Sequence, residues 1–320
     1  MLYAYRSTET TLDPIDPAGA GLGDAVWIDL FLARPEQVAA VEALGVQVPE
    51  LADMEELQLS SRLYRLGGAN YMTVVLPGMS PDGRRLSLPL CLVLGPERLV
   101  TVRFHAPEAL AAYPERAGKS GAGCGSPARI CLGLVEEMVD QLSDTLEEIG
   151  RALDTTSGEV FDGGKLNRTV MLQRALETTG RFGVRIGAAR HSLLTLERAI
   201  NYLEQFPTGT DDPKTIRHLL HGQARDIAAL SVHADYLAAR ASVVTDATLG
   251  MIGLEQNKSV SMLSALVALF APAMLIASIY GMNFTWMPEL DSRWGFALAL
   301  AGMGISGIAT YIFFRRRGWM

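Results

Sequence analysis

Two long apolar segments close to the C-terminus constrain this chain more than any other feature. Residues Ser259 to Pro288 carry no charged side chain, and neither do Trp294 to Phe314. As helices rising ~1.5 Å per residue, the first segment up to Tyr280 and the whole second segment are long enough to cross a ~30 Å hydrocarbon core. The sequence therefore predicts two membrane-spanning helices, over 259–280 and 294–314, joined by a loop over 281–293.

The charges after the second segment predict how these helices are oriented. Arg315, Arg316 and Arg317 follow it directly and open a short basic tail, residues 315–320. Arginines next to a span favour the cytoplasmic side, and two spans return the chain to the side from which it came. We therefore expect a multi-pass protein of the inner (plasma) membrane, with both termini in the cytoplasm and the loop 281–293 outside.

The loop between the two segments carries a recognisable motif. Tyr280-Gly281-Met282-Asn283 is followed by Met287-Pro288-Glu289-Leu290, and the basic tail contains Trp319. In order, spacing and position these residues resemble the CorA family of divalent-cation channels, closely from about Asp246 onward and loosely before it. The resemblance implies a homopentameric funnel that carries Mg²⁺, with Co²⁺ and Ni²⁺ as surrogates, into the cytoplasm.

The N-terminal residues 1–117 have the pattern of an α/β domain. Pro35 opens an amphipathic helix over 35–44, and turn residues such as Ser80-Pro81-Asp82-Gly83 separate the later apolar runs. Those runs predict strands over 25–30, 71–76, 86–94 and 99–104. The sheet is expected to be mixed or partly antiparallel, and the resemblance implies a cytoplasmic α/β/α arrangement.

A glycine-rich segment, residues 118–126, follows this domain and is expected to be a flexible loop. Gly118-Lys119-Ser120 matches the end of a phosphate-binding loop, but Tyr113 stands where that motif requires glycine.

Three cysteines without zinc-type spacing are expected to be reduced thiols. The first twenty residues lack the basic start and apolar core of a signal peptide. The formal charge of −7 argues against a nucleic-acid partner.

From residue 127 the pattern becomes helical. Apolar residues recur at helical spacing over 127–206, which predicts a cytoplasmic hairpin with a turn at Gly158 to Gly164. Asp211 is a candidate cap for the next helix, which finds no terminator except Pro272 before Tyr280. Up to ~67 helical residues would span ~100 Å, more than a bilayer, so 214–258 is expected to be a stalk outside the membrane.

One face of the first span is the candidate pore lining. Counted back from Asn283 at helical spacing, it holds small or apolar residues with polar ones at both ends: Ser278, Met274 or Leu275, Ala271, Val267, Ser264 or Leu263, Val260 and Asn257. Ordinary interhelical packing accounts for the small residues but less well for the polar ends. The resemblance makes Val260 and Leu263 a hydrophobic gate that closes by dewetting, with rings of Asn257 and Asp246 below it.

Asn283 is the residue on which ion selection is expected to depend. Mg²⁺ loses its water reluctantly, so a ring of amide oxygens can accept hydrogen bonds from the hydration shell without removing it. Gly281 permits a tight backbone turn beneath that ring, and Met282 is expected to pack and hold the hinge. Glu289 is expected to concentrate cations at the mouth. Mg²⁺ is thus substrate and expected regulator, and no catalytic cofactor is expected.

The resemblance also implies closure by cytoplasmic metal bound between subunits. Asp53 falls where the family has an acidic residue, and Asp226 is the candidate partner on the stalk. The family commonly has an aspartate at the position of Gly222, so this chain departs from the pattern there. A solvated surface charge paired with Arg217 or Arg225 is the alternative explanation of Asp226.

Two other functions stay open at this stage. His218 and His221 lie on one helical face and are able to chelate Zn²⁺. Zn²⁺ is the ion of the family's ZntB branch. That branch usually replaces the methionine of Gly-Met-Asn and lacks Met-Pro-Glu-Leu, whereas this chain has both. A membrane-anchored sensor or scaffold would explain the cytoplasmic part but not Asn283. An enzyme is not expected, because the chain has no Gly-x-Ser-x-Gly and no His-Glu-x-x-His.

Overall fold

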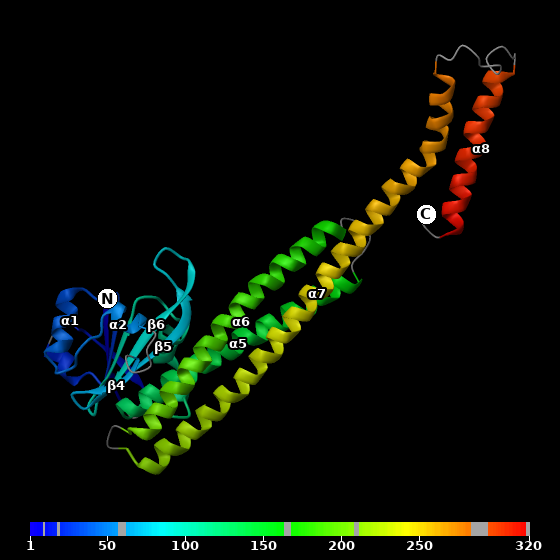
Figure 1. Ribbon diagram of the computed structural model, residues 1–320. Coiled ribbons are helices and arrows are strands. Elements are labelled where there is room, and N and C mark those ends of the chain that lie inside the picture. Colours follow the sequence, from blue (N-terminus) through cyan, green and yellow to red (C-terminus); the bar gives the residue numbers. More distant parts are fainter. Residues whose placement is uncertain are drawn as a thin grey trace. The chain divides into compact units, whose positions relative to one another are not determined.

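The computed structural model describes residues 1–8, 10–17, 20–56, 62–162, 168–207, 211–282 and 294–317. The chain divides into two compact units, one of residues 1–159 with 177–245 and the other of 160–176 with 246–320. The long helices α5 (Pro127–Asp162), α6 (Arg168–Gln205) and α7 (Pro213–Tyr280) each contribute to both units (Figure 1). The units therefore cut across the domain limits expected from the sequence.

A seven-stranded sheet forms the centre of the first unit. Its strands are β1 (Leu2–Ser7), β2 (Leu12–Ile15), β3 (Trp27–Phe31), β4 (Leu63–Leu66), β5 (Ala69–Met79), β6 (Arg85–Leu94) and β7 (Leu99–Arg103). They lie in the order β2-β1-β3-β7-β6-β5-β4, with only β3 and β7 parallel among the paired strands described. The expectation of a mixed sheet is confirmed.

Both faces of this sheet are covered by helices. On one face α1 (Pro35–Glu42) and α2 (Leu51–Glu55) bury Val41 and Met54 in a cluster with Tyr71 of β5. On the other, α4 (Glu108–Arg116) and the long helices share a larger cluster with Met72 and Val74. Successive residues of β5 thus point to opposite cores, as strand geometry requires. The α/β/α arrangement is confirmed.

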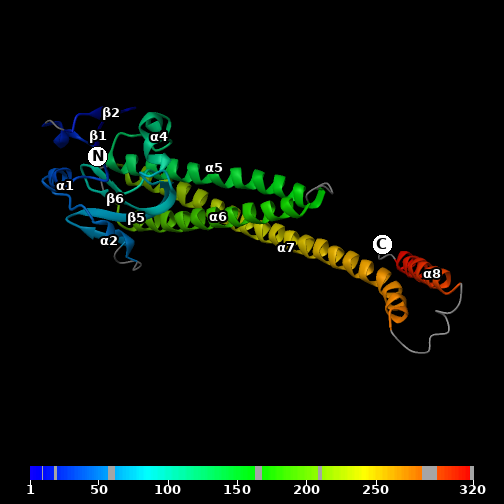
Figure 2. The ribbon, with the colours of Figure 1, turned by 90° about the horizontal axis from the view of Figure 1, so that it is seen from above.

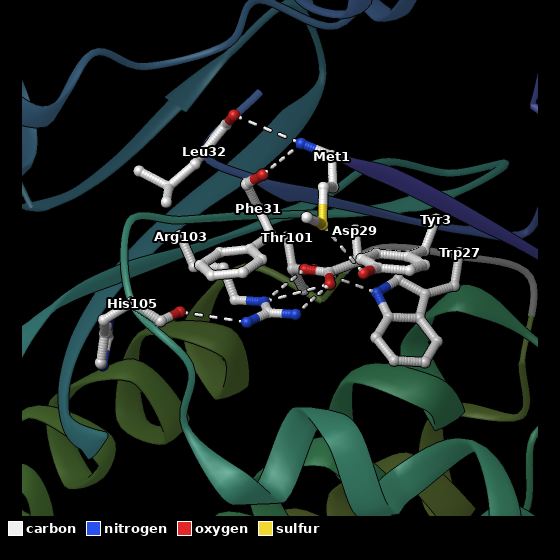
Figure 3. Close-up of polar contacts among 9 residues, drawn as sticks. All are labelled: Met1, Tyr3, Trp27, Asp29, Phe31, Leu32, Thr101, Arg103 and His105. Carbon is white, nitrogen blue, oxygen red and sulfur yellow. Dashed lines mark hydrogen bonds and ion pairs between the residues drawn. The ribbon is translucent and has the colours of Figure 1, made fainter. Parts of the chain in front are cut away.

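A buried ion pair fastens the parallel strands β3 and β7 together (Figure 3). The Asp29 carboxylate accepts hydrogen bonds from Thr101 Oγ1 at 2.7 Å and from Arg103 Nη2 at 2.8 Å. Trp27 Nε1 donates to the same threonine at 3.2 Å, and the Arg103 guanidinium lies 4.3 Å from the centre of the Phe31 ring. Several partners on each charge compensate for the desolvation that burial imposes.

The glycine-rich segment 118–126, which we expected to be a flexible loop, packs against its neighbours. A short 3₁₀ helix, η2 (Ala117–Lys119), leads into it, and Ala122 and Cys124 are buried. Ser120 Oγ donates to a carboxylate oxygen of Glu136 on α5 at 2.6 Å. The small residues of this segment allow the chain to lie close to α5. The same glycine-rich composition is typical of a loose linker, so composition alone does not distinguish the two.

The helix ends also differ in detail from the expectation. Residue Gly158 lies within α5, which continues to Asp162. Asp212, rather than Asp211, caps α7, because its carboxylate accepts hydrogen bonds from the Thr215 amide and hydroxyl. Asp211 instead forms an ion pair with Arg129, at 3.1 Å from Nε. Uninterrupted helix from residue 213 to 280 is confirmed.

Within the first unit, α5, α6 and α7 lie side by side (Figures 1 and 2). Ion pairs connect all three of them: Glu148 to Arg185, Arg190 to Asp235, and Asp154 to Arg240. Between these charges, apolar residues such as Leu146, Leu193 and Leu237 are buried. The three helices therefore form one packed layer against the sheet.

The second unit contains the end of α7 and α8 (Gly295–Arg316), the two helices of the described residues that are long and apolar enough to cross a membrane. The covered side chains on both helices recur every three or four residues, as Ala265, Ala268 and Ile276 on α7 and Gly302 and Ser306 on α8. A side-chain carbon built on Gly302 would lie 3.9 Å from Ile276 Cδ1. Small residues thus let the two helices approach closely, as is usual between helices in lipid.

Candidate functional pore and metal sites

The expected pore residues all lie on an exposed side of α7. This set comprises Asp246, Asn257, Val260, Leu263, Ser264, Val267, Ala271, Met274 and Ser278. Val260, Leu263 and Met274 leave 60%, 62% and 67% of their surface uncovered. On a helix that crosses a membrane, exposed apolar side chains contact either lipid or another helix. At about 3.6 residues per turn, this row lies away from the side that α8 covers.

A third side of the same helix suits lipid. Met262, Leu266 and Phe270 are exposed and recur four residues apart. They lie between the side that contacts α8 and the expected pore row. The end of α7 thus has one side for α8, one apolar side without polar residues, and the expected pore row with a polar residue at each end. Only the last is suited to contact with water and ions.

The expected selectivity filter begins where α7 ends. The Gly281 amide donates to the carbonyl oxygens of Ala277 and Ser278, at 3.0 and 3.2 Å, and the Met282 amide donates to Ile279 O at 3.2 Å. A side chain on Gly281 would lie 3.3 Å from Ala277 O, so glycine suits this tight last turn. Met282 is exposed rather than packed. Asn283 and Glu289 lie outside the described residues.

The basic ring expected from the sequence stands at the end of α8. Arg315, Arg316 and Arg317 are exposed. The Arg317 guanidinium lies 5.2 Å from the centre of the Phe313 ring, an arrangement that combines a cation with an aromatic face. Cations at a helix C-terminus are also favoured by the helix dipole.

The structure does not bring the two candidate regulatory residues together within one chain. Asp53 belongs to α2, whose Met54 packs on one face of the sheet, whereas Asp226 belongs to α7, whose Ile227 packs on the opposite face. The Asp53 carboxylate accepts a hydrogen bond from the Glu50 amide at 3.3 Å and so also stabilises its own helix start. Any metal shared by the two requires a second copy of the chain.

Asp226 lies in an acidic groove that the sequence did not reveal. The groove runs between α5 and α7 and is lined by Glu136, Val139, Asp140, Ser143, Gln223, Asp226, Ala229 and Leu230. Burial, together with the charges of Glu136 and Asp144, raises the pKa of Asp140. The ion pairs with Arg217 or Arg225 that would explain Asp226 are not among those formed by the described residues. Glu136 and Asp140 come from α5 and Asp226 from α7. The spacing of acidic residues along α5 therefore could not predict this groove.

Gln223 adds an amide oxygen to this groove. Its Nε2 donates to Leu132 O at 2.6 Å, while its buried Oε1 has no hydrogen-bond partner. Carboxylate and amide oxygens are the ligands preferred by Mg²⁺ and Ca²⁺. Across the described part of the chain, no group of three His, Cys, Asp or Glu side chains is arranged to hold a metal ion. The groove is therefore a partial ligand set in a single copy.

Of the two histidines that are candidate zinc ligands, His221 has other contacts. His221 Nδ1 lies 2.9 Å from Arg217 O, and its Nε2 lies 3.8 Å from Glu204. His218 is exposed one turn earlier. A backbone bond that occupies one ring nitrogen leaves only the other for a metal.

The fold and these sites define a class of protein: an α/β domain followed by long helices, the last of which continues into the first of two apolar spans. A family model described as "CorA-like Mg2+ transporter protein" matches residues 23–316. The chain belongs to this family.

Individual relatives agree with that assignment. The "Magnesium transport protein CorA" of Haemophilus influenzae is 27% identical over 322 residues, and that of Salmonella typhimurium is 26% identical over 325, with both chains covered completely. Among solved structures, the CorA magnesium transporter from Methanocaldococcus jannaschii matches with a TM-score of 0.75 at 18% identity, covering 100% of this chain and 99% of that one. The full-length CmaX protein matches with a TM-score of 0.68 at 17% identity, over 98% and 96% of the two chains.

Proposed function

We propose that several copies of this chain, five by family resemblance, form a channel that conducts divalent cations, Mg²⁺ above all, into the cytoplasm. The observation that carries the proposal is the exposed row of α7 from Asn257 to Ser278, polar at both ends and apolar between them except at Ser264. Two spans in one chain cannot enclose a pore, whereas copies that bring these rows to a common axis can. The role is that of a channel and not of an enzyme.

In the proposed pore each part of the row has its own task. Rings of Asp246 and Asn257 hold hydrated cations at the cytoplasmic end. Val260 and Leu263 make an apolar constriction that stops conduction when it dries. Gly281, Met282 and Asn283 form the entry filter, where amide oxygens accept hydrogen bonds from hydrated Mg²⁺. Glu289 raises the local cation concentration outside.

The membrane potential supplies the driving force. Moving one charge across 100 mV is worth about 2.3 kcal/mol, so a divalent cation gains roughly twice that on entering a negative interior. The arginines 315–317 hold the C-terminus at the cytoplasmic face of the inner membrane, and the N-terminal unit lies on the same side. No ATP is needed.

We further propose that cytoplasmic Mg²⁺ closes this channel through Asp53 and the acidic groove at Asp226. Asp226 supplies a carboxylate with no arginine partner among the described ion pairs, and Asp140 and Gln223 Oε1 supply further oxygens. Asp53 of a neighbouring copy completes the set. Binding of a cation between copies would favour the closed arrangement, because a ligand shifts a protein toward the state that it binds more tightly.

Uptake into proteoliposomes with a negative interior tests the proposal. The native chain should take up Mg²⁺, and Asn283→Ala should abolish uptake, with Zn²⁺ followed in parallel. Uptake of Zn²⁺ without Mg²⁺ would transfer the chain to the zinc-transporting branch, and uptake of neither would favour a membrane-anchored sensor. Asp53→Asn should leave the channel less sensitive to internal Mg²⁺, and unchanged inhibition would contradict the regulatory proposal.

A further inference from the structure

The end of the α5–α6 hairpin packs against α7 just before the proposed gate. Val160 of α5 and Leu172 and Ala175 of α6 are buried in a small cluster with the partly buried Met251 and Ile252 of α7. These residues all belong to the second unit. We call this contact, together with Arg168 and Glu255, the tip brace.

Met251 and Glu255 of the brace lie on the side of α7 that faces away from Asn257. At about 3.6 residues per turn, Met251 and Glu255 share one side of the helix, Asn257 and Val260 share another, and Ile252 lies toward the side of Leu263. The brace therefore supports α7 from outside, about two turns before Val260. Movement of α7 relative to the hairpin tip at this level must first break the brace.

The braced part of α7 is also a weak part of the helix. Gly250 and Gly253 are exposed, with no heavy atom within 4 Å of a side-chain carbon built on either. Glycine leaves the backbone of a helix more freedom than any other residue. Two glycines three residues apart lower the resistance of this part of α7 to bending.

The polar half of the brace is incompletely paired. Arg168 Nε lies 3.7 Å from Glu255 Oε1, beyond hydrogen-bond distance, and Nη2 donates to Met251 Sδ at 3.5 Å. The same Nε is buried and has no hydrogen-bond partner. A buried donor without a partner on a partly exposed cation is costly, so this contact is one that a moderate change in free energy can break.

We infer that Arg168 and Glu255 are positioning residues for the gate: the tip brace holds α7 straight at Gly250 and Gly253 and keeps the constriction at Val260 closed. Opening releases the brace and lets α7 bend. This inference rests on the proposed channel function, and it assigns gating residues outside the pore row and outside the acidic groove.

Transport by charge variants tests the inference. In proteoliposomes with closing Mg²⁺ on the cytoplasmic side, Arg168→Gln and Glu255→Gln should each raise residual Mg²⁺ uptake roughly three- to tenfold. The double variant should leak no more than either single one, because both remove the same contact. The exchanged pair Arg168→Glu with Glu255→Arg should restore closure. Arg181→Gln, an exposed arginine on the same helix, is the matched control and should not leak.

Hydrogen exchange provides a readout that does not depend on transport. Leu172→Ala should speed amide exchange over residues 246–263, whereas Val170→Ala, at an exposed position near it on α6, should not. The inference would be overturned if both charge variants took up Mg²⁺ as the native chain does and closed as completely. It would also be overturned if the effects of the two substitutions multiplied in the double variant. If the native chain transports nothing, the channel proposal fails, and unchanged exchange in Leu172→Ala then decides against the brace separately.

Discussion

Gly133 on α5 lies so close to Tyr113 that no larger residue fits at this position. A side-chain carbon there would lie 2.3 Å from Tyr113 Oη, and Tyr113 is buried with its ring 5.8 Å from Trp27, edge to face. Gly133→Ala must displace this aromatic pair, which we expect to cost about 1–3 kcal/mol. The melting temperature of the full chain in detergent should fall by several degrees.

Gly180→Ala is the matched control for that substitution. Gly180 is exposed on α6, and a side-chain carbon there meets no heavy atom within 4 Å. Alanine is preferred over glycine inside a helix by roughly 1 kcal/mol, so this variant should melt at the same or a higher temperature. Equal losses in both variants would contradict the steric argument at Gly133.

His105 makes the stability of the first unit depend on pH. Burial lowers its pKa to about 4, and its Nε2 lies 2.9 Å from Leu76 O. Because the unfolded chain binds a proton near pH 6.5 and the folded chain does not, stability should be full above pH 6.5 and fall as the pH drops toward 4, by up to about 3 kcal/mol. Melting temperatures across this range measure the slope, and His105→Gln should flatten it. An equal slope in that variant would assign the effect to carboxylates.

At the scale of elements, the contact between α7 and α8 depends on small residues. Gly302→Val places a branched side chain against Ile276 and should separate the helices, because close approach in lipid needs small residues at the contact. We expect a lower melting temperature in detergent. Gly304→Val, at an exposed position two residues later, should leave it nearly unchanged. A loss at Gly304 as large as at Gly302 would contradict the packing described here.

The acidic groove between α5 and α7 should be less stable without a cation than with one. The raised pKa of Asp140 reflects burial and the charges of Glu136 and Asp144, so its ionised form destabilises the metal-free fold. Asp140→Asn should therefore raise the melting temperature without Mg²⁺ and reduce the further rise that added Mg²⁺ produces. Glu147→Gln, an exposed position on the same helix, should keep the Mg²⁺ effect. A Mg²⁺ effect that survives in Asp140→Asn would remove the groove from the regulatory site.

Which elements the sequence revealed depended on their burial. Most of β5, β6 and β7 is buried and rich in apolar residues, so their positions could be predicted from the sequence. Strands β1, β2 and β4 are short and half exposed, and α4 contains Pro114, so neither pattern nor length distinguished them from loops. The groove at Asp226 and the tip brace join residues far apart in sequence, and no single periodicity predicts such contacts.

At the scale of the whole molecule, a single chain leaves its most distinctive surface without a partner. The row from Val260 to Met274 is exposed and apolar except at Ser264, and the carboxylates near Asp226 form an incomplete ligand set. Assembly of several copies around an axis would cover the exposed row and complete the ligand set. Pore formation and regulation are therefore expected to require the same oligomer. The mass of the chemically crosslinked native protein should be that of a pentamer.

The most direct test of the account is the electrical current through the native protein in a planar bilayer, with Mg²⁺ as the only small cation and no ATP. A Mg²⁺ channel should carry current whose reversal potential shifts by roughly 30 mV for each tenfold change in the Mg²⁺ gradient, as two charges per ion require. Absence of current, or a reversal potential that follows the anion gradient, would contradict the account.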